Sequence, residues 1–244
     1  QVLIFGSGPA GISLALKLEK KKISSLIIEA GSEEYDNLSQ EDYNATFFGD
    51  EITDLRYSRL RQFGGTSGHW GGWCKPMEEW NFNKANLDFI NLKSYFSEAS
   101  SILNIDSKFN KIELNEYFNQ IQFQFSNVRF AEKYRDHISN SKFIDLALNS
   151  QLSHFDGENG TKIFGANIIS KNQNFLIKAK FYILACGGVE NSRILLWSKE
   201  KNPKLFDSRI PVGKYWMTHP WFLGGSGFIK KKEIQDLLKE KFLD

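Results

Sequence analysis

The chain has 244 residues, which is enough for one large domain or two small ones. Its hydrophobic content of 41% and charged content of 25% are ordinary for a globular protein, and a net charge of +2 gives no electrostatic reason to expect nucleic acid or an anionic membrane as a partner. No apolar run is long enough to span a bilayer, and two cysteines do not make a disulfide framework.

The first predicted unit is a strand, a glycine-rich turn and a helix. Residues 1–5 are a short apolar run typical of a buried strand, and apolar residues at helical spacing follow the turn. The turn itself reads Gly-Ser-Gly-Pro-Ala-Gly. Gly6 allows a tight turn, Gly8 lets a phosphate approach the backbone, and Gly11 lets the helix and the strand pack closely. The unit therefore offers free backbone N–H groups and a positive dipole end to a pyrophosphate.

A second strand follows at Ser25–Ile28 and ends in Glu29. A carboxylate at this distance from the glycine turn accepts ribose hydroxyls, and it favours an unphosphorylated ribose because a 2′-phosphate would be repelled. Together the strand, turn, helix and acid predict dinucleotide binding. The alternative is a glycine-rich turn in some other α/β protein.

A second glycine cluster lies at residues 64–72, after a polar stretch with no clean period. Five glycines in nine residues are incompatible with a helix interior, and the tryptophans and histidine among them make a poor flexible linker. We expect the backbone here to lie close to a flat ligand. His69 has two interpretations: it hydrogen-bonds backbone in a tight loop, or its imidazole lies against a cofactor ring. Trp70 is interpreted as part of a wall.

The middle of the chain, residues 75–127, reads as an insertion. Within it Leu92–Leu103 has the spacing of an amphipathic helix with one apolar face, and Tyr117–Phe125 is either strand or loop. Phe130–Ile138 is predicted as a short helix.

The last third returns to strands. Phe143–Leu148 is predicted as a strand, and Lys162–Ile169 with Asn174–Lys178 as a hairpin. Phe181–Ala185 is a further buried strand, followed by a cysteine, two glycines and a helix through Asn191–Trp197. Its cysteine, at position 186, is predicted to be a small buried hydrophobe. No histidine or cysteine spacing fits a zinc site, and no Gly-x-Ser-x-Gly motif is present.

The second cluster resembles the flavin-site motif of the glucose–methanol–choline (GMC) oxidoreductases, and is most similar to the bacterial sugar-dehydrogenase and pyranose-oxidase branch. Further stretches agree with the family in order, so that the resemblance covers nearly the whole chain: residues 29–31, 129–134, 184–193, 212–214 and 219–220.

The resemblance implies FAD as the cofactor and an α/β, FAD-binding Rossmann-like fold. It places the pyrophosphate on the first glycine turn, the adenosine ribose on Glu29, the adenine on the backbone of Leu152, and the ribityl–isoalloxazine end on the second glycine turn. The second strand–glycine–helix unit closes around the cofactor. The implied FAD-binding residues are Gly6, Gly8, Gly11, Glu29, Gly64, Gly65, Thr66, Ser67, His69, Trp70, Leu152, Ala185 and Gly187.

In pyranose oxidases the histidine of a matching motif carries the flavin covalently, while many relatives bind FAD without a covalent bond. His69 is therefore a candidate for attachment, with both outcomes open.

The family's chemistry is hydride transfer from an alcohol or sugar carbon to flavin N5, with a histidine base from the C-terminal region. Nothing in this sequence matches that base, so no catalytic residue is assigned here. We expect an FAD-binding domain over residues 1–224, with the insertion within it, and the start of an incomplete substrate-binding domain over 225–244. The chain would thus be the cofactor-binding part of a larger enzyme, inactive by itself.

Two other classes stay open: a flavoprotein reduced by NAD(P)H, and a non-catalytic protein-binding relative of the fold, such as the Rab GDP-dissociation inhibitors. The first would need a second dinucleotide motif or a redox Cys-x-x-Cys, and the second has no need of the second glycine cluster. The alcohol and the electron acceptor (oxygen, a quinone or a cytochrome) are not specified. We expect a cytoplasmic protein, with the periplasm open because the chain begins without Met, inside its first strand.

Overall fold

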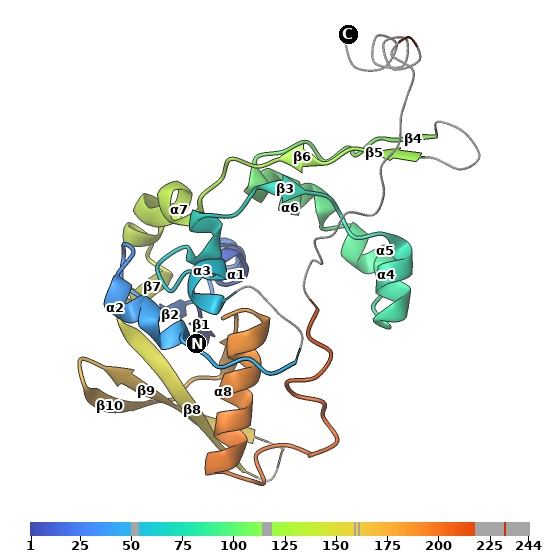
Figure 1. Ribbon diagram of the computed structural model, residues 1–244. Helices are drawn as coiled ribbons and strands as arrows, with labels where there is room; N and C mark the ends of the chain where they lie inside the picture. Colours follow the sequence, from blue (N-terminus) through green and yellow to red (C-terminus); the bar gives the residue numbers. More distant parts are fainter. Residues whose placement is uncertain (50–53, 114–118, 159, 161, 218–231, 233–244) are drawn as a thin grey trace. The chain divides into compact units, whose positions relative to one another are not determined.

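The computed structural model describes residues 1–49, 54–113, 119–158, 160, 162–217 and 232 (Figure 1). Contacts between Cα atoms divide the chain into two units, Gln1–Lys214 and Tyr215–Asp244. Nearly all described residues belong to the first unit. The domain boundary predicted after residue 224 lies outside the described residues.

The centre of this unit is a four-stranded parallel sheet with the order β11-β1-β2-β7. The strands are Val2–Phe5 (β1), Ser25–Ile28 (β2), Ile144–Ala147 (β7) and Phe181–Leu184 (β11). β1 pairs with β2 on one side and with β11 on the other, which places the two strand–glycine–helix units next to each other. The sequence prediction of an α/β fold with a parallel sheet is therefore confirmed.

Both faces of the sheet are covered, as parallel sheets require. On one face Ile4 of β1 packs in a buried cluster with Ile12 of α1 (Pro9–Lys20) and Phe130 of α7 (Phe130–Ser139). On the other face Leu3 and Phe5 pack against α8 (Gly188–Lys201) and a second sheet. This alternation along β1 explains why its sequence is a continuous apolar run.

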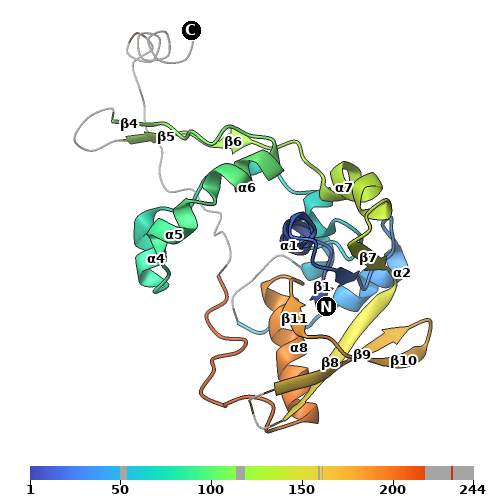
Figure 2. The same cartoon turned by 180° about the vertical axis from the view of Figure 1, so that it is seen from behind.

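The second sheet is antiparallel, with the order β10-β9-β8. It consists of Ser150–Glu158 (β8), Lys162–Ser170 (β9) and Gln173–Ile177 (β10), and β8 lies beside α8 (Figure 2). The predicted hairpin is β9 and β10, and both residues of its turn, Lys171 and Asn172, have positive φ. The sequence reading missed β8, because polar residues interrupt its alternation.

Short turns connect β2 to the second glycine cluster, in the stretch where no period was found. They are α2 (Asn37–Gln40), η1 (Glu41–Tyr43) and α3 (Leu55–Ser58), with Asp36 and Asp54 capping the two α-helical turns. The glycine cluster itself forms a 3₁₀ turn, η2 (Gly65–Gly68). Four-residue turns of this kind leave no helical period in a sequence.

The described part of the predicted insertion contains three helices, α4 (Glu79–Lys84), α5 (Phe89–Lys93) and α6 (Phe96–Leu103). Two short antiparallel pairs accompany them. β3 (Trp73–Cys74) pairs with β6 (Gln124–Phe125), and β4 (Lys111–Glu113) pairs with β5 (Asn119–Ile121). The stretch that was open between strand and loop thus contains both.

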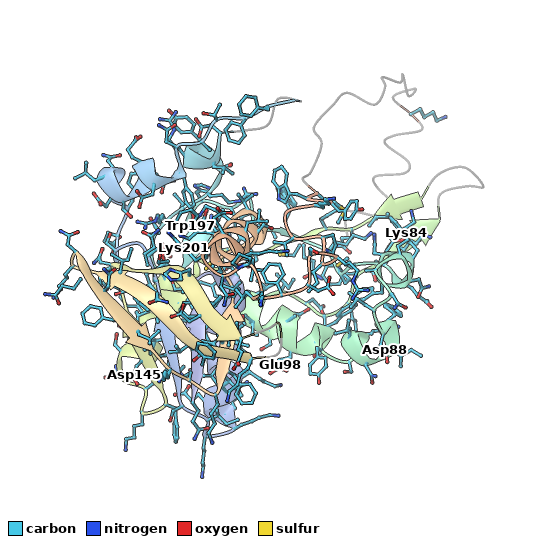
Figure 3. The ribbon with its side chains drawn as sticks, turned by 90° about the horizontal axis from the view of Figure 1, so that it is seen from below. Lys84, Asp88, Glu98, Asp145, Trp197 and Lys201 are labelled. Atoms are coloured by element: carbon cyan, nitrogen blue, oxygen red, sulfur yellow. The ribbon has the colours of Figure 1, made fainter. Side chains whose placement is uncertain are left out.

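The single helix predicted over Leu92–Leu103 is wrong, because the chain forms two helices there. Asp88 caps α5, because its Oδ1 accepts a hydrogen bond from Asn91 N at 3.1 Å. At the end of α5 the hydroxyl of Ser94 donates to the carbonyl of Asn91 at 2.6 Å. Side-chain bonds of this kind compete with continued helix. The expected apolar face is buried only in part, since Tyr95 is 56% exposed while Ile102 and Leu103 pack against the core. Asp88 and Glu98 mark the two helices in Figure 3.

Candidate functional site

A cavity of about 370 Å³ lies at the carboxyl ends of β1, β2 and β11. Ligands of open α/β sheets bind at this edge, outside the ends of the strands. The wall includes the first residues after each strand, and also parts of β8 and of the second glycine cluster. Of the residues predicted to bind cofactor, those on the wall are Gly6, Gly8, Glu29, Gly65, Thr66, Leu152, Ala185 and Gly187.

The glycines of the first turn have the surroundings that their predicted roles require. A Cβ on Gly6, whose φ is +97°, would lie 2.6 Å from the carbonyl oxygen of Ala185, and a Cβ on Gly11 would lie 2.0 Å from that of Gly6. At Gly8 no heavy atom lies within 4 Å of such a Cβ. Gly8 is also the N-cap of α1 and makes no side-chain cap, so the first-turn N–H groups of the helix remain available beside the cavity.

Glu29 is held rigidly at the edge of the cavity and is only 7% exposed. Its Oε2 accepts hydrogen bonds from Ser7 N at 2.9 Å and Ser7 Oγ at 2.7 Å, and its Oε1 accepts one from Gly31 N at 2.8 Å. Each carboxylate oxygen can accept two hydrogen bonds. Oε1 therefore keeps capacity for a hydroxyl of a ligand, in an orientation set by the other three bonds.

The second glycine turn meets the first. A Cβ on Gly65, which has φ +54°, would lie 3.0 Å from Cα of Gly8. Beside it, Thr66 Oγ1 accepts a hydrogen bond from Leu60 N at 3.3 Å, which ties the turn to the segment before it. Two turns almost sixty residues apart in sequence thus share one wall of the cavity.

Three of the predicted residues lie behind this wall. The hydroxyl of Ser67, 1% exposed, donates to the carbonyl of Gly64 at 2.7 Å and accepts from Phe130 N at 3.1 Å. A Cβ on Gly64 would lie 2.6 Å from Ala131 N. These contacts attach the turn to the start of α7. Gly11 packs on the backbone of Gly6. Close packing therefore explains the two glycines, Gly11 and Gly64, and hydrogen bonds to the backbone explain Ser67.

His69 and Trp70 also lie off the cavity wall. The side chain of His69 is exposed. The indole of Trp70 donates to the carbonyl of Val128 at 3.0 Å and packs edge-on against Phe130, with ring centroids 6.1 Å apart. Trp70 thus contributes to the core, while a contact of either residue with a cofactor stays a prediction.

The turn between β11 and α8 forms the opposite wall. Gly187 has φ +84° and no heavy atom within 4 Å of an added Cβ. Cys186, predicted as a buried small hydrophobe, is half-buried instead; it lines the cavity and donates through its thiol to the carbonyl of Phe5 at 3.1 Å. Burial, reinforced by the negative charges of Glu29 and Glu190, raises the pKa of Cys186 to about 12. At neutral pH this thiol is protonated and is no nucleophile.

Sequence reasoning missed the polar residues that complete the wall, Tyr43, Arg59, Arg61, Glu190 and Arg193. Burial, followed by the charges of Glu190 and Glu29, raises the pKa of Tyr43 well above its ordinary value, so its hydroxyl stays neutral. The sequence does show charged residues at these places: the arginines just before the second glycine cluster, and the Glu–Arg pair after the glycines that follow β11. Tyr43 lies in the polar stretch without a periodic pattern, and nothing in the sequence indicated that it lines a site.

Among the described residues, no group of three or more histidine, cysteine, aspartate or glutamate side chains could hold a metal ion. Within the same part of the chain no helix has the length and apolar character needed to cross a membrane.

No family profile and no curated protein matches the chain. Solved structures are similar to it in fold. Pyridoxine 4-oxidase from Mesorbium loti matches with a TM-score of 0.52 at 15% identity, over 79% of this chain and 50% of that one. A fungal aryl-alcohol oxidase matches with a TM-score of 0.54 at 12% identity, over 80% and 46%. Formate oxidase matches with a TM-score of 0.52 at 14% identity, over 79% and 46%.

This chain therefore spans about half the length of the solved structures that it matches. At such low identity the likeness concerns the architecture. The α/β fold of this chain, with its parallel sheet, is similar to part of each of these oxidases.

Proposed function

We propose that the chain binds FAD and is the cofactor-binding part of an oxidoreductase of the glucose–methanol–choline family. The observation that carries the proposal is that both glycine turns and Glu29, predicted from separate motifs, line one cavity. The motif resemblance and the names of the three oxidases reported above support the same reading.

The residues of the cavity fit the parts of this cofactor. Gly8 and the first turn of α1 offer open space and free N–H groups to a diphosphate. Glu29 presents Oε1 to the hydroxyls of the adenosine ribose. Leu152 would meet the adenine from β8, while Gly65 and Thr66 would face the ribityl side of the flavin.

When bound, FAD would accept a hydride from the CH–OH carbon of an alcohol or sugar. This chain's share of that reaction is to bind and orient the cofactor, since none of the histidines among the described residues lines the cavity. We propose that the base comes from another part of a larger enzyme, so that this chain binds FAD without oxidising alcohols. Two of the neighbouring structures are named for compounds that carry such a hydroxyl, pyridoxine and aryl alcohols. The electron acceptor would be oxygen, a quinone or a cytochrome.

His69 remains a candidate for a covalent bond to the flavin. Acid denaturation of the FAD-loaded protein tests this: a covalent flavin stays with the precipitated protein, and His69→Ala should release it. If the wild-type protein releases all its flavin in acid, binding is non-covalent.

The proposal is tested by purifying the chain and titrating it with FAD, FMN and NAD by calorimetry, with the flavin spectrum recorded for FAD and FMN. We expect FAD to bind, and FMN and NAD to bind more weakly, because neither joins a flavin to an adenosine. Bleaching of bound FAD by NAD(P)H would favour an NAD(P)H-dependent flavoprotein. Failure to bind any flavin would favour a protein-binding relative and overturn the proposal.

A further inference from the structure

The charged side chains that line the cavity are mostly neutralised by partners. Arg193 forms a bidentate pair with Glu190, with an Nη2–Oε2 distance of 2.8 Å. Arg61 pairs with Asp42 at 2.9 Å and also donates to Gln151 Oε1 at 2.9 Å. The positive charges of these two arginines are therefore already balanced by carboxylates, which weakens their attraction for an anionic ligand.

Arg59 is different. Its guanidinium makes one hydrogen bond, from Nη1 to the carbonyl of Ser58 at 2.7 Å, and no described carboxylate lies within ion-pair distance. A guanidinium carries five N–H donors. Arg59 is half-buried and lines the cavity, so most of these donors are available to a ligand there. A partly buried cation without a counter-charge is unfavourable, and a bound anion relieves it.

The backbone of Arg59 is held in place by a buried amide. Gln40, 3% exposed, donates through Nε2 to the carbonyls of Arg56 at 2.8 Å and Arg59 at 2.6 Å, and accepts through Oε1 from Arg61 N at 3.1 Å. All of the hydrogen bonds that this amide makes go to one short segment. The position from which the Arg59 side chain starts is therefore fixed before a ligand arrives.

That position adjoins the meeting point of the two glycine turns. The next residue, Leu60, is tied to Thr66 by a hydrogen bond, and the neighbouring Gly65 touches Gly8, the N-cap of α1. Arg59, which has no carboxylate partner among the described residues, thus lines the same cavity as Gly8, where there is room for a phosphate.

We propose that Arg59 binds the diphosphate of the dinucleotide, opposite the N-terminus of α1. This inference rests on the proposed function, and names the side chain that supplies positive charge to it. A charge-assisted, bidentate contact from arginine suits a phosphate group, and it is stronger than a bond between neutral groups.

The test compares three ligands by titration calorimetry: FAD, ADP and adenosine. Arg59→Gln should weaken FAD and ADP binding about tenfold or more, the loss of one charge-assisted contact. Binding of adenosine should stay within about twofold, because it has no phosphate. Arg59→Lys should retain part of the affinity for FAD and ADP, since lysine keeps the charge without the planar fork. Should Arg59→Gln fold poorly, Arg59→Met, which keeps the packed stem, serves instead.

Arg56→Gln is the matched control. Arg56 lies three residues earlier, is paired with Asp54 at 2.8 Å, and does not line the cavity, so its loss should leave the affinities for all three ligands unchanged. The inference is overturned if a folded Arg59→Gln binds FAD and ADP as the wild type does, or loses adenosine to the same extent. Failure of the wild type to bind FAD would instead overturn the proposed function, and this inference with it.

Discussion

Gly8 and Gly11 lie three residues apart in one turn, and alanine should affect them in opposite ways. At Gly11 an added Cβ would lie 2.0 Å from the backbone oxygen of Gly6, where ordinary contact is 3.4–4 Å. At Gly8 the Cβ would meet nothing within 4 Å, and its φ of −71° is one that alanine adopts freely. Gly11→Ala should therefore destabilise the fold, whereas Gly8→Ala should act on the ligand.

The magnitudes follow from the surroundings. Alanine inside a helix is favoured over glycine by about 1 kcal/mol, so any net loss of stability at Gly11 is smaller than the cost of the overlap by about that amount. Overpacking typically costs about 1–3 kcal/mol, and an overlap with backbone belongs at the upper end, which leaves a net loss of about 2 kcal/mol. At Gly8 the weaker N-cap costs roughly 0.5–1 kcal/mol, while the stiffer unfolded chain returns about 0.4–1 kcal/mol, so stability should hardly change.

Urea unfolding and FAD titration of both variants separate the two effects. We expect a lower unfolding midpoint only for Gly11→Ala, and an affinity for FAD reduced about tenfold for Gly8→Ala, because its methyl group occupies the approach of the phosphate. Wild-type stability in Gly11→Ala would refute the argument from close packing. Wild-type FAD affinity in Gly8→Ala would refute the assignment of this turn to the phosphate.

Three further outcomes are expected. Ser67→Ala removes the hydroxyl that satisfies two backbone groups and should lower the free energy of unfolding in urea by about 1–3 kcal/mol, whereas exposed Ser94→Ala should change it little. Burial raises the pKa of Glu19, but hydrogen bonds from His137 and a serine outweigh burial and lower this pKa below its ordinary 4.5. The stabilisation that the ionised Glu19 contributes is therefore present above pH 4.5 and is lost as the pH falls through the pKa of the folded state. Glu19→Gln should therefore flatten the acid side of the stability–pH curve, and an unchanged slope would count against the linkage. With a thiol pKa of about 12, Cys186 should resist iodoacetamide at pH values near neutral in the folded protein and react in urea, as peptide mass spectrometry would reveal; rapid alkylation of the folded chain would contradict this.

The local chemistry of the sequence was sufficient for the first strand–turn–helix unit. Gly6 and Gly11 each meet a backbone atom that lies within a few residues or on the adjacent strand, and Gly8 is the N-cap between them, so spacing alone indicated β1, α1 and the acid after β2. The hairpin of β9 and β10, and the helix α7, were readable for the same reason. In β8 the polar residues at Ser150, Ser153 and Asp156 hid the strand, because neighbours in the fold rather than periodicity determine its pairing.

The candidate site divides along the same line. Its glycines and Glu29 could be predicted, because backbone conformation and a terminal carboxylate leave marks in the sequence. Its arginines and Tyr43 could not be ranked, since a charged residue in a sequence carries no sign of whether it is paired. Arg61 and Arg59 are two residues apart, yet one has a carboxylate partner and the other has none among the described residues.

The sequence by itself determined the local conformations: which residues turn, which begin a helix, and which strands are apolar on both faces. Only the tertiary structure decided that the turns at Gly8 and Gly65 meet and that no carboxylate of the described residues pairs with Arg59 beside them. Contacts between residues far apart in the chain depend on how the elements pack, and no short-range pattern of residue types encodes that distance.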